Sequence, residues 1–390
     1  MTQSPLSVAT LRSGVFRFQV AVDVEQTAMA LQRVEDAQTF LNKMPLVPDV
    51  ATRLKRELVA LSAFGNNSID GGTLSEEHIV QLLDGAIPAQ DEKDQRILNL
   101  QSAYEEIDRI AQAHDSEGAR TPGQPQTGIV ITEQMIKSLH TSLTKPMPHQ
   151  PNQSGEYRDN AMGQITKVGT LEHGGIYTPP KCREDIELLM RAFLEWLNSA
   201  TVSTLSPLIR ATLAHFYFYR IHPFWEGNGR VGRALEMVIL KSAGYHYSHY
   251  ALARYYFEHK EEYLTIYNPA RKSEDRHPNT AFVQFFLQGM FDVINRAHER
   301  ASHIIAGILF ENRLQHLLKG KKINVRQHAI VAQLMSLHTP PALADLQAQP
   351  WYDALYQKLS PKTRSRDILG LAEYQLAALS PDGQLRLLIP

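Results

Sequence analysis

The sequence predicts an all-α protein of more than one domain, with only short β segments. Apolar side chains recur at three- and four-residue spacing along most of the chain, which is the period of an amphipathic helix. A chain of 390 residues is too long for one compact hydrophobic core, so two or three domains are expected. With 43% hydrophobic and 21% charged residues, the composition is that of a globular protein.

The net charge and the cysteine content narrow the class of protein. A formal net charge of −1 argues against a chain dominated by electrostatic binding to nucleic acid or to membranes. The single cysteine, Cys182, excludes an intramolecular disulfide framework and suits a reducing cytoplasm. We expect Cys182 to be a surface thiol where a loop meets a helix, beside "TPPK", rather than a nucleophile.

The N-terminal stretch has no targeting pattern. "MTQSPLSVATLRSGVFRFQV" is interrupted by Arg12 and Arg17 and lacks the continuous apolar core of a signal peptide. No run of the chain approaches the ~18–20 apolar residues that a membrane-spanning helix needs. We therefore expect a cytoplasmic protein with no membrane partner.

The first third of the chain is predicted to be helical. The pattern covers residues 25–43, 48–62, 74–84 and 92–113. The polar stretch 114–128, which carries proline and glycine, then predicts a mobile linker. A short helix is expected at 132–143, followed by an irregular piece.

A short segment at 163–178 departs from the helical pattern. It is rich in β-branched residues and glycine and ends at a proline pair, which is typical of a small β-hairpin. Pro207 follows Ser206, an order that suits the first position of a helix. The helical pattern resumes at 184–199, 207–221, 230–243, 249–267, 279–298 and 300–318.

The C-terminal segment has a different pattern from Asn324 onward. An amphipathic helix, "VRQHAIVAQLMSL", comes first. Ser360 and Pro361 then suit the cap and first position of a helix that runs to about Tyr374. Two short apolar strands flank the turn "SPDG". Three helices followed by a hairpin predict a winged helix-turn-helix.

The stretch "HPFWEGNGRVGR", residues 222–233, concentrates chemically active side chains between two apolar helices. Glycines bring backbone N–H groups close to a ligand, and a helix N-terminus attracts anions, so Gly227, Asn228 and Gly229 predict an anion site. Arg230 and Arg233 lie three residues apart on one helix face, so their two guanidinium groups would bind phosphate oxygens in a bidentate manner. A polyphosphate is the expected anion.

The other polar residues of this stretch suit a reaction on that polyphosphate. Glu226 would be repelled by the anion unless a Mg²⁺ ion bridged them, and Mg²⁺ commonly uses one or two carboxylates together with substrate phosphates. His222, held extended by Pro223, has a near-neutral pKa in water and suits a base that accepts a proton from a hydroxyl. Phe224 would anchor the loop to the helices beneath it.

The alternative interpretation is an ordinary interhelical turn with a satisfied core histidine. We favour the chemical interpretation because every polar position is filled in register. The stretch resembles the signature of the Fic family, H-P-F-x-D/E-G-N-G-R-x-x-R, at every defined position.

The resemblance implies a fold, an activity and a set of roles. Fic proteins are all-α enzymes that move AMP from ATP to a hydroxyl side chain of a target protein. By this resemblance His222 is the general base and Glu226 the Mg²⁺ ligand. Gly227, Asn228 and Gly229 would line the anion hole for the α- and β-phosphates. Arg230 and Arg233 would hold the β/γ end, and Mg-pyrophosphate would leave.

The resemblance extends to other segments. The 163–178 hairpin is similar to the Fic flap, which holds the target main chain as an added strand. "LARYYFEHKEEYL" resembles the family helix that closes the adenine pocket, so Tyr255 and Glu258 would approach the nucleotide. An aromatic stripe at this spacing is also typical of a helix core. His140 and His215, on apolar helices, are expected to be packed core histidines.

The segment "NNSIDGGTLS", residues 66–75, resembles the inhibitory stretch of the family, S-N-A-I-E-G-N-T-L-T. There a glutamate pairs with the second arginine of the motif, displaces the γ-phosphate and keeps the enzyme inactive. Here Asp70 precedes Gly71 at that position, and Asn66 replaces the serine. Because Asp is one methylene shorter than Glu, we expect weaker inhibition through Arg233. A capped interhelical turn is the alternative interpretation.

The C-terminal segment resembles the winged-helix appendage of many bacterial Fic proteins. Lys362, Arg364 and Arg366 lie along its last helix and would meet DNA phosphates, but Asp367 interrupts them and a solvated face explains them equally. A role of this segment in dimerisation or target docking is at least as well supported as DNA binding.

The sequence thus predicts an N-terminal helical region with the inhibitory-type segment and linker at 1–128, a Fic core at 129–320 and a winged helix at 321–390. The leading function is a protein adenylyltransferase that uses ATP and Mg²⁺, modifies a Ser, Thr or Tyr hydroxyl of a target protein, modifies itself and is autoinhibited. The alternatives are a homologous enzyme that uses another nucleotide or removes AMP, and a DNA-binding regulator with the Fic core as nucleotide sensor. A homodimer and weak DNA binding are further partner predictions.

Overall fold

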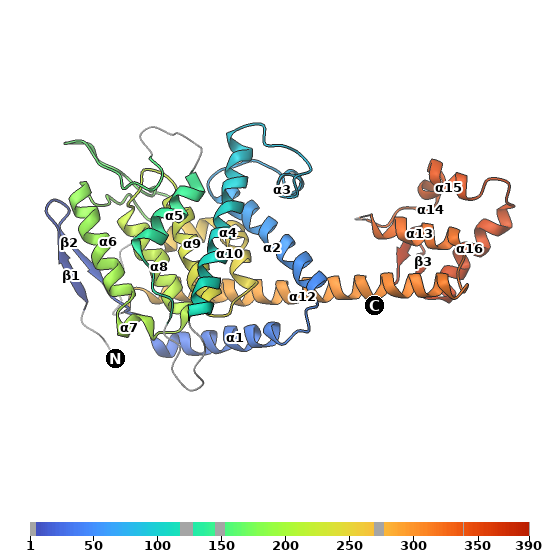
Figure 1. Ribbon diagram of the computed structural model, residues 1–390, viewed down its shortest axis with the longest axis horizontal. Helices are drawn as coiled ribbons and strands as arrows, with labels where there is room; N and C mark the ends of the chain where they lie inside the picture. The colour runs from blue at the N-terminus through green and yellow to red at the C-terminus, as the bar shows by residue number, and fades with distance from the viewer. Residues whose placement is uncertain (1–4, 118–127, 145–152, 269–276, 338, 390) are drawn as a thin grey trace. The chain divides into compact units, whose positions relative to one another are not determined.

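The structure, a computed structural model, describes residues 5–117, 128–144, 153–268, 277–337 and 339–389. It is mostly helical, as predicted (Figure 1). The chain divides into two compact units, Met1–His298 and Glu299–Pro390, and the division falls within the long helix α12 (Thr280–Lys319).

The first unit is built around two buried helices, α8 (Pro207–Ile221) and α9 (Asn228–Ser242), which pack against each other. Both are buried on nearly every side, so they form the centre of the core rather than a surface layer. The other helices of this unit before α12 are α1 (Val24–Asn42), α2 (Pro48–Ile69), α3 (Glu76–Leu83), α4 (Glu92–Glu117), α5 (Glu133–Thr144), α6 (Arg183–Leu197), α7 (Ala200–Ser203), α10 (Ser248–Glu258) and α11 (Lys260–Ile266). Helices α4, α5 and α10 all contact α9.

Helix α2 continues seven residues beyond its predicted end at residue 62. Gly65 lies inside this extension, where α2 packs against α10. A Cβ at Gly65 would come within 2.4 Å of the backbone C and O atoms of Ala253. The glycine therefore serves a close helix–helix approach and does not end the helix. The extension carries Asn66 and delivers Asp70, the C-cap of α2, to the motif.

Two predicted helix boundaries in the second half of this unit were wrong. The single helix expected at 249–267 is two helices, because the backbone breaks at His259 with φ −115° and ψ 37°. The two helices expected at 279–298 and 300–318 are one helix, α12. The junction between them, "RAHERASH", contains neither glycine nor proline, so nothing in it interrupts the helix. The predicted linker begins late, since α4 runs to Glu117; residues 118–127 lie outside the described part of the chain.

The strand predictions also need correction. The predicted hairpin at 163–178 is reduced to one antiparallel bridge between Val168 and Tyr177. Gly169, Gly174 and Gly175 have positive φ, and this turn-rich backbone replaces a continuous ladder. A hairpin that we did not predict, β1 (Leu6–Ala9) with β2 (Val15–Phe18), lies at the N-terminus.

This N-terminal hairpin docks on the first unit through aromatic packing and one carboxylate. The ring of Phe18 lies 5.6 Å from that of Trp196 and 5.3 Å from that of Tyr217. Asp185, which is fully buried on α6, accepts hydrogen bonds from the backbone N–H groups of Leu11 and Arg12 and from the Ser13 hydroxyl. Burial opposes this ionisation, but the three donors hold the pKa of Asp185 below its ordinary value.

Cys182 is the N-cap of α6, so it lies where a loop meets a helix, as predicted. The prediction of a surface thiol was wrong, because the side chain is buried. Burial raises the pKa of the Cys182 thiol, which disfavours the reactive thiolate.

After α12, the described part of the second unit has four helices before its hairpin, one more than the three helices predicted. The elements are α13 (Val325–Met335), α14 (Leu343–Gln347), α15 (Pro350–Leu355), α16 (Pro361–Glu373), β3 (Ala377–Leu379) and β4 (Leu385–Leu387). The strands form an antiparallel hairpin, and Ala342 adds a bridge to Gln384. Asp367 does not interrupt a surface patch: it is buried and accepts hydrogen bonds from Asn324, Arg326 and Tyr356. Arg364 pairs with Asp353.

Among the described helices, none combines the length and apolarity required to cross a bilayer.

Replacing Asp185 with alanine should destabilise the first unit. Three donors would lose their acceptor, and we expect a loss of about 2 kcal/mol in the free energy of unfolding. Urea denaturation checks this. Glu195→Ala, an exposed position on the same helix, is the matched control. Equal midpoints for the two variants would show that Asp185 does not hold the hairpin.

Candidate active site

The motif 222–233 forms the tight connection between the two central helices. α8 is followed by His222, its C-cap. The extended backbone expected for His222 before Pro223 was wrong: the residue is left-handed (φ 52°, ψ 58°) and turns the chain, and α9 begins after Gly227 (φ 80°). Phe224 is fully buried and stacks on His140 with ring centroids 3.7 Å apart, so it anchors the loop as predicted.

Asn228 has a structural role that we did not predict. Its side-chain oxygen accepts from the backbone N–H of Phe224 at 2.9 Å, and its amide nitrogen donates to the Phe224 carbonyl at 2.7 Å. The side chain therefore closes the loop on itself. What remains for an anion is the backbone of Gly227, Asn228 and Gly229 at the start of α9, where the first N–H groups have no partner inside the helix.

His140, on α5, is buried as predicted and also positions the motif. Its Nδ1 accepts from the N–H of Gly155 at 2.8 Å, and its Nε2 lies 3.1 Å from the carbonyl oxygen of Glu226. This pattern requires the neutral ring with the proton on Nε2. Burial lowers the pKa of His140 to about 4, so the ring is neutral at physiological pH.

His222 is held in place by Arg158, which the sequence reading did not single out. The Arg158 Nε donates to the His222 carbonyl at 2.7 Å, and its backbone N–H donates to the Pro223 carbonyl at 2.9 Å. The same guanidinium donates to the Asn160 side-chain oxygen and the Pro180 carbonyl, which flank the 163–178 segment. Burial, followed by the charge of Arg158, lowers the pKa of His222 to about 3. The imidazole is therefore unprotonated at neutral pH, which is the state that a base requires.

The motif opens onto a cleft of about 360 Å³. The cleft brings together most of the predicted site residues, namely Asp70, His222, Glu226, Gly227, Asn228, Gly229, Arg230 and Arg233. It also contains residues that sequence reasoning missed: Arg96, Tyr219, Trp225, Tyr263, Leu264 and Tyr267. Tyr263 and Tyr267 lie four residues apart after the break at His259. The sequence shows this spacing, but it does not show the helix break that directs these two rings to the cleft.

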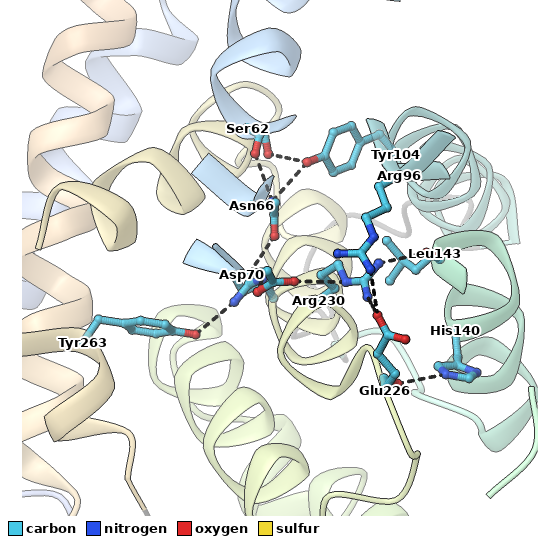
Figure 2. A network of polar contacts seen from close by, with 11 residues as sticks. Ser62, Asn66, Asp70, Arg96, Tyr104, His140, Leu143, Glu226, Arg230 and Tyr263 are labelled. Carbon is cyan, nitrogen blue, oxygen red and sulfur yellow. Dashed lines mark hydrogen bonds and ion pairs between the residues drawn. The ribbon is translucent and has the colours of Figure 1, made fainter. Parts of the chain in front are cut away.

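The two arginines of the motif are buried, with 6% of Arg230 and 4% of Arg233 exposed, and each has several oxygen partners. Arg233 donates from Nε to the Asn66 oxygen at 2.6 Å and from Nη1 to the Tyr263 hydroxyl at 3.3 Å. Arg230 donates from Nη1 to the Leu143 carbonyl at 3.0 Å (Figure 2). These contacts fix both guanidinium groups before any ligand binds.

Asp70 contacts both guanidinium groups. Its Oδ1 lies 3.3 Å from Nη2 of Arg233, and its Oδ2 lies 3.1 Å from Nε of Arg230. From the sequence we expected the Asp70 carboxylate to contact Arg233 and to reach less far than a glutamate would. The reach suffices because α2 extends to residue 69 and Gly71, with φ 85°, then turns the chain. Asn66, one helical turn earlier, also binds Arg233 and is linked to Tyr104 on α4 (Figure 2).

Glu226 is paired with cations. Its carboxylate lies 3.0 Å from Nη2 of Arg230 and 3.7 Å from Nη2 of Arg96. Within the described ranges, no group of three or more His, Cys, Asp or Glu side chains is placed to hold a metal. A single carboxylate fits Mg²⁺ only when substrate phosphates supply further ligands.

Glu258 and Tyr255 do not line the cleft. Glu258 forms ion pairs with Arg254 at 2.8 Å and Arg296 at 2.6 Å. Tyr255 is buried against Phe285 and His259. The break at His259 changes the helical register, so α11 rather than α10 presents its aromatic rings to the cleft. We therefore remove Glu258 from the candidate site.

The profile of the Fic/DOC family matches residues 130–240, which include α8, the motif and nearly all of α9. Residues 130–240 form a Fic domain. The protein adenylyltransferase Fic of Drosophila erecta is 40% identical over 118 residues, which are 30% of this chain and 21% of that protein. The chain therefore matches only about a fifth of that relative's length.

Two solved structures have a similar fold over more of the chain than residues 130–240. A Fic family protein from Desulfovibrio desulfuricans G20 is similar with a TM-score of 0.56 at 19% identity, over 92% of this chain and 95% of that chain. A Fic domain-containing signalling protein from Bacteroides thetaiotaomicron has a TM-score of 0.51 at 21% identity, over 70% of this chain and 97% of that chain. At these identities the likeness concerns the fold.

The His140 pKa predicts a loss of stability in acid. The unfolded histidine binds a proton below pH about 6.5 and the folded one only near pH 4. Stability is therefore fully present above pH about 6.5 and falls as the pH drops toward 4, by up to about 3 kcal/mol from this residue. Urea denaturation of wild type and His140→Gln from pH 7.5 to 4.5 measures this contribution. The free energy of unfolding of the variant should depend less steeply on pH than that of wild type. Parallel curves for the two proteins would contradict this prediction.

Proposed function

We propose that this protein is a protein adenylyltransferase, which moves AMP from ATP to a hydroxyl side chain of a target protein. The proposal rests on one observation. A neutral histidine, a helix N-terminus and two buried arginines face one cleft, from residues that fill every defined position of the Fic signature. The names of the matched relatives support the same activity.

Polyphosphate binding is assigned to the start of α9. Its free backbone N–H groups and helix dipole favour an anion, and Arg230 and Arg233 add two charged forks on the same side. We assign the α- and β-phosphates to residues 227–229 and the β/γ end to the arginines. Glu226 would hold a Mg²⁺ ion brought in with the phosphates, and the ion would supply charge neutralisation there.

His222 is assigned the role of general base. Its neutral ring accepts the proton of the target hydroxyl as the hydroxyl oxygen bonds to the α-phosphorus. The bond from that phosphorus to the α–β bridging oxygen breaks, and pyrophosphate leaves with the electron pair. Arg158 keeps the backbone of His222 and Pro223 in place during this transfer.

Asp70 is assigned an inhibitory role. It occupies both guanidinium groups that the β/γ end of the nucleotide would use. A γ-phosphate and this carboxylate cannot bind the same guanidinium groups at the same time, because their negative charges repel each other. Contact with both arginines supports inhibition by the shorter Asp side chain. The same carboxylate would serve the alternative reaction, removal of AMP.

The remaining assignments follow the same proposal. The 163–178 segment, tied to His222 through Arg158, would align the extended main chain of the target. The second unit would act as a winged helix in docking or dimerisation of a cytoplasmic enzyme. For the rival function, a DNA-binding regulator, the support is limited to exposed Lys362 and Arg366 on α16, since Arg364 is paired with Asp353.

Replacing His222 with alanine should abolish self-modification. Wild type incubated with α-labelled ATP and Mg²⁺ is expected to incorporate label, and His222→Ala to lose it by about 10²-fold or more because the base is gone. Filter-bound radioactivity or a mass shift of one AMP measures this. His316→Ala, at an exposed position, is the control. Absence of label in every protein, together with salt-sensitive DNA binding, would favour the rival function of a DNA-binding regulator. Incorporation of label only from another nucleotide would show that ATP is not the substrate.

Replacing Asp70 with glycine should increase self-modification. Loss of the carboxylate frees Arg230 and Arg233 for the nucleotide, and a rise of roughly tenfold in initial rate is expected. Asp70→Asn, which keeps the shape, should give a similar increase because the charge is what competes. Asp84→Asn, in the Arg56 ion pair, is the matched control. Equal rates in wild type and Asp70→Gly would show that Asp70 does not inhibit the enzyme.

A further inference from the structure

A second cavity, of about 300 Å³, lies in the first unit at the other end of the central helix pair. Ser206 and Pro207, where α8 begins, line it, whereas His222 follows the end of α8. Ser242, the last residue of α9, lines it as well, whereas the motif opens α9. A helix of this length spans about 22 Å, so the cavity is separate from the cleft.

The cavity contains a buried cation without a carboxylate partner. Arg210 is 2% exposed and donates to the carbonyls of Ile129 at 2.8 Å and Leu197 at 3.3 Å, and to the Asn198 side chain at 3.1 Å. No Asp or Glu of the described chain lies within ion-pair distance of it. Burial lowers the pKa of Arg210 to about 10, so the group stays charged at neutral pH. A buried charge is normally paired.

Two serines that line the same cavity have buried hydroxyl groups with no hydrogen-bond partner in the described part of the chain. These are Oγ of Ser206 and Oγ of Ser242, and Ser242 is only 6% exposed. Nη1 of Arg210 makes none of the three hydrogen bonds above. Gly128 also lines the cavity, and a Cβ there would come within 2.6 Å of this nitrogen. In the part of the chain that the structure describes, a charged nitrogen outside those three bonds and two unpartnered hydroxyls thus surround one space.

The rest of the lining is mixed: His114, Ser203 and Thr204 also line the cavity, together with apolar residues. Ile129, Leu205 and Ile239 contribute side chains to the wall. A polar head group would meet Arg210 and the two hydroxyls, while an apolar body would contact these residues. The volume suits a compound of small size.

From these contacts we propose that the cavity binds a small organic anion, a carboxylate or phosphate head on an apolar body, with Arg210 as its counter-charge and Ser206 and Ser242 as hydrogen-bond donors. The site is independent of the nucleotide cleft and does not depend on the proposed function.

The test measures thermal unfolding and calorimetric binding of the full chain with hexanoate, hexanol and inorganic phosphate. Hexanoate should raise the unfolding temperature in a concentration-dependent way, with or without saturating ATP, and hexanol should not. Stabilisation by phosphate alone that ATP leaves unchanged would support a phosphate head group. No stabilisation by either anion, an equal effect of hexanol, or an effect that ATP abolishes would overturn the proposal.

Variants locate the site. Ser206→Ala combined with Ser242→Ala should weaken anion binding by about five- to tenfold, because two donors to a charged head group are lost. These substitutions remove hydroxyls that have no partner, so the fold should be retained. Ser102→Ala, whose hydroxyl bonds within its own helix, is the matched control. Unchanged affinity in the double variant would place the ligand elsewhere and overturn the assignment.

Discussion

The candidate active site depends on the burial of two guanidinium groups at the start of α9. A buried cation is tolerated only when oxygen atoms surround it. Asn66, Asp70 and Tyr263 supply them for Arg233, and Asp70, Leu143 and Glu226 supply them for Arg230. These partners come from α2, α5, the motif loop and α11, so the arginines join four separate parts of the chain. Asp70 is the shared partner, and an anionic ligand for both arginines must displace it.

The two histidines of the candidate site have different roles: His222 is the base that we propose, and His140 supports the loop. His222 ends α8 in a left-handed conformation held by Arg158, whereas His140 supports the loop from α5. Both are neutral because burial disfavours the charged ring. Neutrality leaves His222 free to accept a proton and lets His140 accept one hydrogen bond while it donates another. The same physical cause therefore serves a reactive group and a structural one.

The central pair α8 and α9 also sets the relation between the cleft and the second cavity. Each helix contributes one end to the motif and the other end to the space around Arg210. Both places have buried arginine, but only the motif has carboxylates beside it. The positive charges of Arg230 and Arg233 are therefore neutralised by carboxylates of the protein, whereas for Arg210 we propose an anionic ligand.

The sequence by itself determined the helical class, most helix cores and the motif, because helical periodicity and a contiguous signature are local properties. It also placed Asp70 opposite Arg233, since the inhibitory-type stretch is contiguous too. The tertiary structure decided what depends on contacts between distant segments. Gly65 continues a helix because Ala253 lies against it; Arg96, Arg158 and Tyr263 join the site through folding, and Glu258 leaves it because α10 breaks one residue later. Such outcomes follow from packing in three dimensions, which no local pattern of residues encodes.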